Sequence, residues 1–574
     1  MVPKELTGDD MLRLQTIVNN KSLVVNDAIA KSMEIISELT SYTAVVLGKQ
    51  SKDNLINKIE VIPVDDKNLV AIIVTNKGHV EHKNVYIDGY VSMQDIKEWI
   101  LPEYSLKSRH IRNEIDQLAQ ERPTMYADAF TTKYYKEKGH FIWITRHGID
   151  EKADTLLSYL RKCEEEGFKP SSFYISKIEE DLQDLRNRKL SQKDINQLMG
   201  RLEYHLTKAL LRYATGQRYG FIQPSHVLNN IESEKSYPEA SQRHHFGIHA
   251  EIATDSFYYH ALAQAQSKNL GTFLREVQPQ LPLYKTLKQE YLSTKKKENT
   301  GRAHLARINM ERARWRYPRP QGKYVWVNLA GFQLTAVNEK TDSMLTMRIC
   351  GGAIAHKSPL LTSKITRLEV NPYWVIPPSI IRYEIAPSHT GDTAYFARHR
   401  YNVIDKRTGG SVNPASLSSA QLNSGQYVVR QENGGGNSLG RVIFRFPNDF
   451  SVYLHDTNTP SAFRLATRAV SHGCIRLEKP LDLAFFIMED LDSIQQDRIR
   501  MEIGKAPVTQ WGKKYRAENP QIEERPKHKT YPIESGFSVF LDYYTLYPNK
   551  EGTLEEHPDN YHYDTIIENA LDSF

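Results

Sequence analysis

Apolar and polar positions follow different periods along the chain and divide it into regions of different secondary structure. Near the N-terminus, two helical stretches and a short strand at residues 43–48 come first. Three β-rich runs follow at residues 59–64, 69–76 and 79–87, separated by turn signals rich in Asp, Asn and Gly. Short runs of this composition are typical of strands joined by turns. We therefore predict a small α/β unit over residues 1–105.

The next region, residues 106–320, has the spacing of amphipathic helices. Residues 153–160 place apolar side chains at helical intervals. The same spacing recurs farther along, at Leu202, Leu206, Ala209, Leu210 and Tyr213. Apolar positions three and four residues apart form one packed helix face. Gly220 and Pro224 then end this helix, because neither residue favours its continuation. The pattern predicts a helical domain.

A period of two returns after residue 322. Residues 324–329 are β-rich, residues 332–337 alternate apolar and polar positions, and residues 345–350 form a third run ended by two glycines. Alternation of this kind places one face of each strand in a core. We predict a mainly antiparallel β domain over residues 321–505.

Within this β domain, residues 381–440 form a long, turn-rich insertion. A loop of that length in a compact domain is usually functional or disordered. Residues 440–454 return to strand and carry His455 to the strand end. The fold class predicted for the whole chain is multidomain α+β.

The remaining C-terminal elements are predicted from single residues. Pro480 is well placed as the first residue of a helix. The buried stripe of this helix is predicted to be Leu481, Ala484, Phe485 and Met488. Residues 506–574 are predicted to close the β domain with a strand at 539–547 and a final helix. Residues 505–530 are charged and are predicted to be loop-like.

Bulk composition excludes several classes of protein. The chain has 574 residues, of which 40% are hydrophobic and 25% charged, and its net charge is +6. A chain of this length exceeds a single core, so several domains are expected. No apolar run approaches the roughly eighteen residues that cross a bilayer, so no membrane span is expected. Lys295-Lys296-Lys297 is a short basic run, but a nucleic-acid binder needs a denser patch, so no nucleic-acid partner is expected.

The candidate chemistry lies at a histidine and a cysteine. His455 is followed, after fifteen residues, by the sequence Ser-His-Gly-Cys-Ile-Arg at residues 471–476. A thiol is a weak nucleophile at neutral pH unless a neighbouring imidazole takes its proton. We interpret Cys474 as a nucleophile and His455 as its base, and Cys163 and Cys350 as small buried side chains. A metal site would need further ligands at short spacing, which the chain lacks, so neither a metal nor another cofactor is expected.

The pattern His-x15-Ser-His-Gly-Cys-Ile-Arg resembles the signature of the YkuD-type L,D-transpeptidase catalytic domain. This resemblance implies a cysteine-dependent acyltransferase that cross-links or trims peptidoglycan through a thioester. The implied partners are stem peptides, namely a tetrapeptide donor and an amine acceptor. Release of D-alanine would be followed by a 3–3 cross-link or by hydrolysis. Carbapenem-type compounds are expected to inhibit such an enzyme.

Other residues of the pattern receive roles under the same resemblance. The tetrahedral oxyanion needs preorganised donors, for which the backbone N–H groups of Gly473 and Cys474 are candidates. His472 either stabilises the turn or replaces His455 as the base, and the first role is favoured. Arg476 either pairs with a stem-peptide carboxylate or forms a structural ion pair. Tyr453 and Ser471 are further candidates for substrate contact.

The resemblance extends over about residues 110–574. The helical region resembles the scaffold that precedes the catalytic domain in the large, capped L,D-transpeptidases, and residues 309–315 close it in the same way. The insertion at 381–440 then corresponds to a lid over the active site. At Glu432-Asn433 the chain departs from the usual Pro-Gly, which puts the lid geometry there in doubt.

Residues 1–105 have a separate resemblance. Residues 39–47 and 74–81 resemble the middle domain of the heat-inducible transcription repressor family, without a counterpart of its DNA-reading domain. Two alternatives to a transpeptidase follow: a cytoplasmic, repressor-like regulatory protein, and a wall-binding scaffold without catalysis. The transpeptidase resemblance implies a periplasmic or cell-envelope location. The first thirty residues nevertheless lack the basic-then-apolar layout of a secretory signal.

Overall fold

The structure is a computed structural model that describes most of the chain after residue 105. The described residues are 106–145, 148–187, 192–229, 250–315, 320–520, 527–549 and 551–574, together with the backbone of three strands between residues 56 and 86. Two compact units are distinguished and are described separately. The first comprises residues 1–123, 131–154 and 176–207, and the second comprises residues 124–130, 155–175 and 208–574.

Three strands form an antiparallel sheet near the N-terminus. They are β1 (Ile56–Pro63), β2 (Asn68–Thr75) and β3 (Val80–Tyr86), in that order across the sheet. Their positions agree with the three β-rich runs of the sequence. The predicted helices and the strand at residues 43–48 lie outside the described residues.

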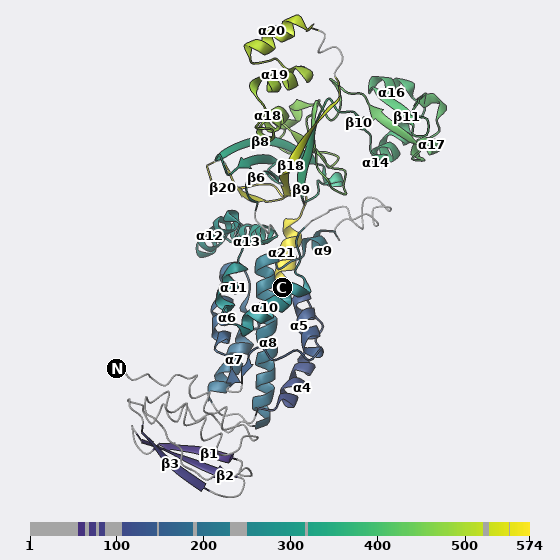
Figure 1. Ribbon diagram of the computed structural model, residues 1–574. Helices are drawn as coiled ribbons and strands as arrows, with labels where there is room; N and C mark the ends of the chain where they lie inside the picture. The colour runs from purple at the N-terminus through teal and green to yellow at the C-terminus, as the bar shows by residue number, and fades with distance from the viewer. Residues whose placement is uncertain are drawn as a thin grey trace, which may run out of the picture. The chain divides into compact units, whose positions relative to one another are not determined.

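The helix α8 (Gln192–Tyr219) belongs to the first unit up to residue 207 and to the second from residue 208. In the first unit, α4 (Ser108–Leu118) and α7 (Ile175–Asn187) lie alongside it (Figure 1). Glu203 of α8 is fully buried, and its carboxylate accepts hydrogen bonds from the backbone N–H groups of Ile142, Trp143 and Ile144 at 2.5, 2.9 and 3.1 Å. A buried carboxylate is tolerated only when its oxygens are satisfied in this way. The helix ends at Tyr219, as predicted from Gly220 and Pro224.

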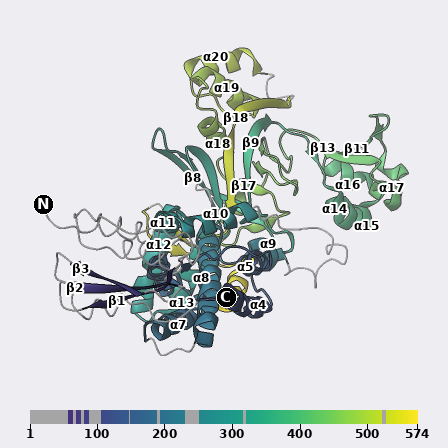
Figure 2. The same ribbon diagram turned by 60° about the horizontal axis from the view of Figure 1, so that its bottom comes forward.

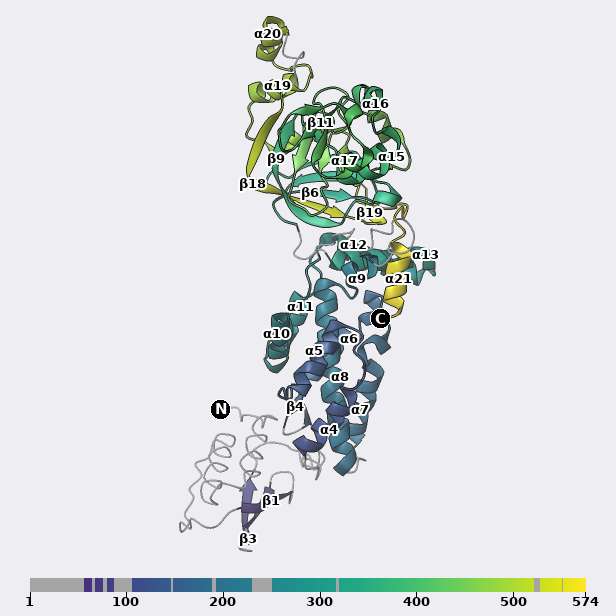
Figure 3. The ribbon, with the colours of Figure 1, turned by 90° about the vertical axis from the view of Figure 1, so that its right-hand side faces the viewer.

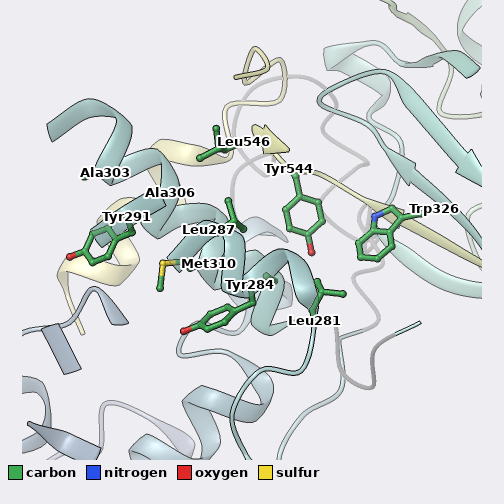
Figure 4. Packing of buried hydrophobic residues seen from close by; sticks show 11 residues of the cluster. Leu281, Tyr284, Leu287, Tyr291, Ala303, Ala306, Met310, Trp326, Tyr544 and Leu546 are labelled. Atoms are coloured by element: carbon green, nitrogen blue, oxygen red, sulfur yellow. The ribbon is translucent and has the colours of Figure 1, made fainter. Parts of the chain in front are cut away.

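In the second unit, a helical hairpin packs directly on the β domain. The hairpin consists of α12 (Pro282–Lys296) and α13 (Thr300–Arg314). Its apolar face buries Leu287 and Met310 in one cluster with Trp326, Tyr544 and Leu546 of the β domain (Figure 4). Burial of several large side chains at this contact stabilises the connection between helices and sheet by the removal of apolar surface from water.

The β domain is built on one curved sheet. The strands are β6 (Lys323–Asn328), β7 (Gln333–Asn338), β8 (Ser343–Gly352), β9 (Leu361–Val370), β14 (Val442–Arg445), β15 (Leu454–His455), β16 (Ala469–Ser471), β17 (Ile475–Leu477) and β18 (Lys529–Asp542). Their order is β16-β8-β17-β15-β14-β9-β18-β6-β7, and β7 also pairs with β8, so the sheet closes on itself. Figure 3 shows the curvature at β9, β18 and β6. The pairings β15–β17, β16–β8 and β18–β6 are parallel, whereas the others in this sheet are antiparallel.

Residues between β9 and β14 fold into a small subdomain with its own core, which we call the cap (residues 374–431). Its sheet has the order β10-β13-β11-β12, with β10 (Trp374–Val375), β11 (Tyr401–Asp405), β12 (Ser411–Val412) and β13 (Tyr427–Gln431). The helical segments α14 (Pro378–Ile380), η5 (Ile381–Ile385), α15 (Ala386–His389), α16 (Thr393–Arg398) and α17 (Ser419–Asn423) gather around it (Figure 2). β10 pairs with β13, so this sheet includes residues that precede the predicted insertion start at 381.

Three details of the predicted elements are corrected by the structure. The third β-rich run was predicted to stop before Gly351 and Gly352, but both glycines belong to β8 and are its last two residues. In α18 (Pro480–Ile487), Leu483 and Ile487 are buried, whereas Phe485 and Met488 are only half-buried. Part of the predicted loop at 505–530 is α20 (Gln510–Glu518).

The final helix was predicted correctly, whereas the C-terminal strand, predicted at 539–547, is β18 at Lys529–Asp542 and begins within the predicted loop. The strand β18 lies between β9 and β6, and its pairing with β9 is interrupted by a bulge between Pro532 and Phe537. The final helix is α21 (Asp564–Asp572).

Candidate active site

The register of two short strands brings His455 and Cys474 to the same face of the sheet. β15 and β17 are parallel, with Leu454 opposite Ile475 and His455 opposite Arg476. The pairing extends by one hydrogen bond, from the backbone N–H of Ile475 to the carbonyl oxygen of Tyr453 at 2.9 Å. Because side chains alternate between faces, Cys474 lies on the face of His455 and Arg476. Cys474 directly precedes β17, so His455 and Cys474 are diagonal neighbours across the β15–β17 pairing.

The opposite face of these strands anchors them in the core. Leu454 and Ile475 have no exposed surface. Their burial fixes which residues of β15 and β17 face the site, since a shift of one residue would move every side chain to the other face.

The turn that carries the nucleophile is held by Ser471. The Ser471 hydroxyl donates to the carbonyl oxygen of Cys474 at 2.5 Å and accepts from the backbone N–H of Gly473 at 3.1 Å. Gly473 has φ +106°, a conformation that side-chain-bearing residues rarely adopt. Ser471 was predicted to contact substrate, but it is 3% exposed and its hydroxyl serves the turn.

A second set of hydrogen bonds holds the same turn from the other side. Ser358 is fully buried, and its hydroxyl donates to the carbonyl oxygen of Gly473 at 2.7 Å. The same hydroxyl accepts from the backbone N–H of Gly352 at 2.9 Å. The hydroxyl of Tyr561 donates to the carbonyl oxygen of Gly352 at 2.8 Å and accepts from the N–H of Ser358 at 3.1 Å. A Cβ atom at Gly352 would lie 2.1 Å from the carbonyl oxygen of His356, so only glycine fits there.

The environment of His455 favours the neutral imidazole. Its side chain is buried, with 4% of the residue exposed. Burial, followed by the positive charge of Arg476, lowers the pKa of His455 from 6.5 to about 4, although backbone carbonyl groups of Asp456 and Leu439 oppose the shift. The imidazole is therefore uncharged at neutral pH and can accept a proton.

The environment of Cys474 favours the neutral thiol. Burial raises the pKa of Cys474 above its usual value, whereas the backbone of Tyr453 and the charges of Arg445 and Arg476 oppose that shift. The thiol lies 3.8 Å from the carbonyl oxygen of Ser451. A neutral thiol beside a neutral imidazole is thus the resting state that these surroundings favour, rather than a preformed thiolate.

Two arginines make this side of the site electropositive. The Nε of Arg476 is buried without a hydrogen-bond partner, and the residues that the structure describes include no ion-pair partner for this side chain. The guanidinium of Arg445 lies 4.3 Å from the centroid of the Tyr453 ring and contacts Glu369 at 3.2 Å. The described residues thus provide no structural ion pair for Arg476.

His472 is directed to the cap. Its Nε2 lies 2.8 Å from Oε1 of Glu384, and both side chains are about half exposed, at 47% and 50%. Its ring centroid is also 4.9 Å from that of His356. His472 thus contacts the cap, whereas His455 lies on β15, which pairs with β17.

One protein family matches this chain in the predicted β domain, and another matches it in the predicted helical domain. Residues 322–501 match the L,D-transpeptidase catalytic domain (YkuD), and residues 128–290 match the scaffold domain. The resemblance to the YkuD-type L,D-transpeptidases is thereby confirmed. A putative L,D-transpeptidase of Haemophilus influenzae is 27% identical over 310 residues, which are 53% of this chain and 58% of the relative.

The N-terminal resemblance is confirmed as well. Residues 26–132 match the C-terminal domain of the HrcA protein. The heat-inducible transcription repressor HrcA of Bacillus pumilus is 32% identical over 96 residues, which are 17% of this chain and 28% of the repressor. The chain spans less than two thirds of the length of either relative. None of the helices in the described residues is both long and apolar enough for a membrane crossing.

Sequence reasoning missed Ser358, Tyr561 and Glu384. Ser358 is 115 residues from its hydrogen-bond partner Gly473, and Tyr561 is 203 residues from its partner Ser358. Glu384 is 88 residues from His472. No local pattern marks such long-range contacts. In the described part of the chain, no group of three or more His, Cys, Asp or Glu side chains is placed to hold a metal ion.

Proposed function

We propose that this protein is a peptidoglycan L,D-transpeptidase that forms a thioester on Cys474. The observation that carries the proposal is the β15–β17 register, which gives His455 and Cys474, the residue directly before β17, the same face of the sheet. A nucleophile and its base must come within hydrogen-bond reach during the reaction, although this contact is often looser without substrate. The match of residues 322–501 to the catalytic domain supports the same assignment.

Proton transfer accompanies attack in the proposed mechanism. The lowered pKa of His455 and the raised pKa of Cys474 favour a neutral pair, so the imidazole accepts the thiol proton as sulfur bonds to the donor carbonyl carbon. The tetrahedral intermediate collapses when the bond to D-alanine breaks, and the imidazolium gives its proton to the leaving amine. The acyl group then remains on sulfur until an amine or water releases it, giving a 3–3 cross-link or a trimmed stem.

The backbone N–H of Cys474 is the proposed oxyanion donor. The N–H of Gly473, also predicted for this role, donates to Ser471 at 3.1 Å. No hydrogen bond from the Cys474 amide is found to the residues that the structure describes. An amide at the nucleophile itself lies beside the carbonyl that the sulfur attacks. Loss of one such donor typically costs about 3 kcal/mol of transition-state stabilisation.

Arg476 is proposed to receive a carboxylate of the donor stem peptide. A buried guanidinium nitrogen without a partner is costly, and a carboxylate would satisfy it by a charge-assisted hydrogen bond. The ring of Tyr453, held by Arg445, would form the adjacent wall. These contacts give the donor an orientation relative to the sulfur.

The proposal is tested by D-alanine release from a tetrapeptide stem. We expect release by the parent protein and none by Cys474→Ala, because the variant lacks the thiol that forms the thioester. The control is Cys163→Ala, which removes a buried thiol from the helical region. Equal release by the parent protein and Cys474→Ala would disprove the assignment. If the parent protein and Cys474→Ala both bind peptidoglycan and neither releases D-alanine, the result would instead favour a wall-binding scaffold without catalysis.

A further inference from the structure

A carboxylate of the cap lies beside the turn that carries Cys474. Glu384 belongs to η5, and its Oε1 is 2.8 Å from Nε2 of His472, two residues before the nucleophile. Half of the Glu384 side chain remains exposed, so a charged group from solvent can approach the carboxylate. The cap thus places a negative charge beside the turn that carries Cys474, on which the positive charges of Arg445 and Arg476 also act.

The charge of Glu384 acts on two aromatic side chains of the cap. Burial and the negative charge of Glu384 both raise the pKa of Tyr395, and Glu384 acts in the same direction on Tyr401. The ring of His389 stacks on Tyr395 at 3.7 Å, and the ring of His399 lies 4.2 Å from it. Because these histidines pack against Tyr395, the group that the cap offers to a cation is the half-exposed carboxylate of Glu384.

Different groups at the site therefore suit opposite charges. Arg445 and Arg476 suit the carboxylates of a donor, as proposed above. Glu384 suits a cation. A transpeptidase has two substrates, and the second is an amine that is protonated in solution at neutral pH.

We propose that Glu384, held by His472 beside the turn that carries Cys474, binds the ammonium group of the acyl acceptor. This inference rests on the proposed transpeptidase function and assigns the acceptor subsite within it. Glu384 is a specificity-determining residue here, because it favours a cationic acceptor over water.

Transfer to the acceptor forms an amide bond and breaks the thioester bond to Cys474. The bound ammonium loses one proton to His472 or to solvent, and the resulting amine bonds to the thioester carbonyl carbon. The carbon–sulfur bond then breaks, and a second proton passes from nitrogen through His455 to the leaving sulfur. The products are an amide and the free Cys474 thiol.

The test separates acylation from transfer. Glu384→Gln retains a hydrogen-bonding side chain but removes the charge, and we measure the ratio of cross-linked to hydrolysed product from a tetrapeptide donor. With an acceptor stem that carries a side-chain ammonium, we expect the ratio to fall about fivefold, the effect of a partly exposed charge pair. With hydroxylamine, which is uncharged at neutral pH, we expect no change.

A matched variant controls for general effects on the cap. Glu432, which directly follows the cap and pairs with Arg400 of the cap at 3.6 Å, has a similar exposure of 48%, and Glu432→Gln removes its carboxylate. We expect this variant to have the parent ratio with both acceptors. The rate at which a carbapenem acylates Cys474 should also be unchanged in both variants.

Four outcomes would overturn the inference. Equal loss with the ammonium acceptor and hydroxylamine would show that the charge of Glu384 does not select the acceptor. Slower carbapenem acylation of Glu384→Gln would make the residue a support of the cap or turn. An unchanged ratio would remove it from the acceptor site. Failure of the parent protein to become acylated at all would refute the transpeptidase proposal itself, and the inference with it.

Discussion

The protonation state of His455 leads to a quantitative prediction for the pH dependence of acylation. Burial and Arg476 lower its pKa from 6.5 to about 4. This difference of about 2.5 pKa units, at about 1.4 kcal/mol per unit, disfavours the imidazolium by roughly 3 kcal/mol. An exposed histidine base would lose half of its activity near pH 6.5. The structure predicts that acylation of Cys474 persists to about pH 5 and falls to half near pH 4.

The same shift affects the stability of the fold. Because the folded-state pKa is the lower one, the unfolded chain binds more protons between pH 6.5 and about 4. Burial of His455 therefore destabilises the fold progressively as the pH falls through this window, by up to roughly 3 kcal/mol. Circular dichroism at each pH identifies the range in which the rate reports on folded protein.

The assay is the rate of covalent carbapenem adduct formation, followed by intact-protein mass between pH 4 and 8. The variant His472→Gln removes the other histidine of the pattern, whose ring contacts Glu384 and is not the proposed base. We expect its midpoint to equal that of the parent protein. A midpoint near pH 6.5 in the parent protein, or one that moves in His472→Gln, would refute the reasoning about His455.

Two further predictions concern the turn that carries Cys474. Ser358→Ala removes the hydroxyl shared by Gly473 and Gly352, and leaves both groups buried, so we expect a loss of about 1–3 kcal/mol in urea unfolding and slower acylation. Unchanged unfolding would show that this hydroxyl does not support the turn. Gly473→Ala forces a side chain into φ +106°, and we expect a loss of about 1–3 kcal/mol together with slower acylation. Acylation at the parent rate would show that the turn has no such requirement.

Elements with a strong local signal could be predicted from the sequence. The apolar face of α8 is regular, and all of its predicted apolar residues are buried. Pro480 begins α18 as expected. The helix α19 (Ser493–Glu502) was not predicted, although Asp492 and Gln495 form a capping box that marks its start.

Contacts between distant parts of the chain could not be predicted. The sequence placed His455 and Cys474 in one site through their spacing within a known pattern. It contained no sign that Ser358 and Tyr561 support the turn, since these contacts exist only after β8 and the C-terminal segment come together. The pair of Glu384 and His472 likewise depends on the folded cap. The resting charges of the catalytic pair follow from burial, which the sequence does not specify.

The central claim is that the acyl group of the donor is carried on Cys474. Its most direct test is rapid quenching of the protein with a tetrapeptide donor, followed by mass mapping of the peptide that contains residues 471–476. The account predicts a mass increase on Cys474 equal to the donor acyl group without its terminal D-alanine. D-alanine release with that peptide unmodified at every quench time, or an increase located on Cys350, would contradict it.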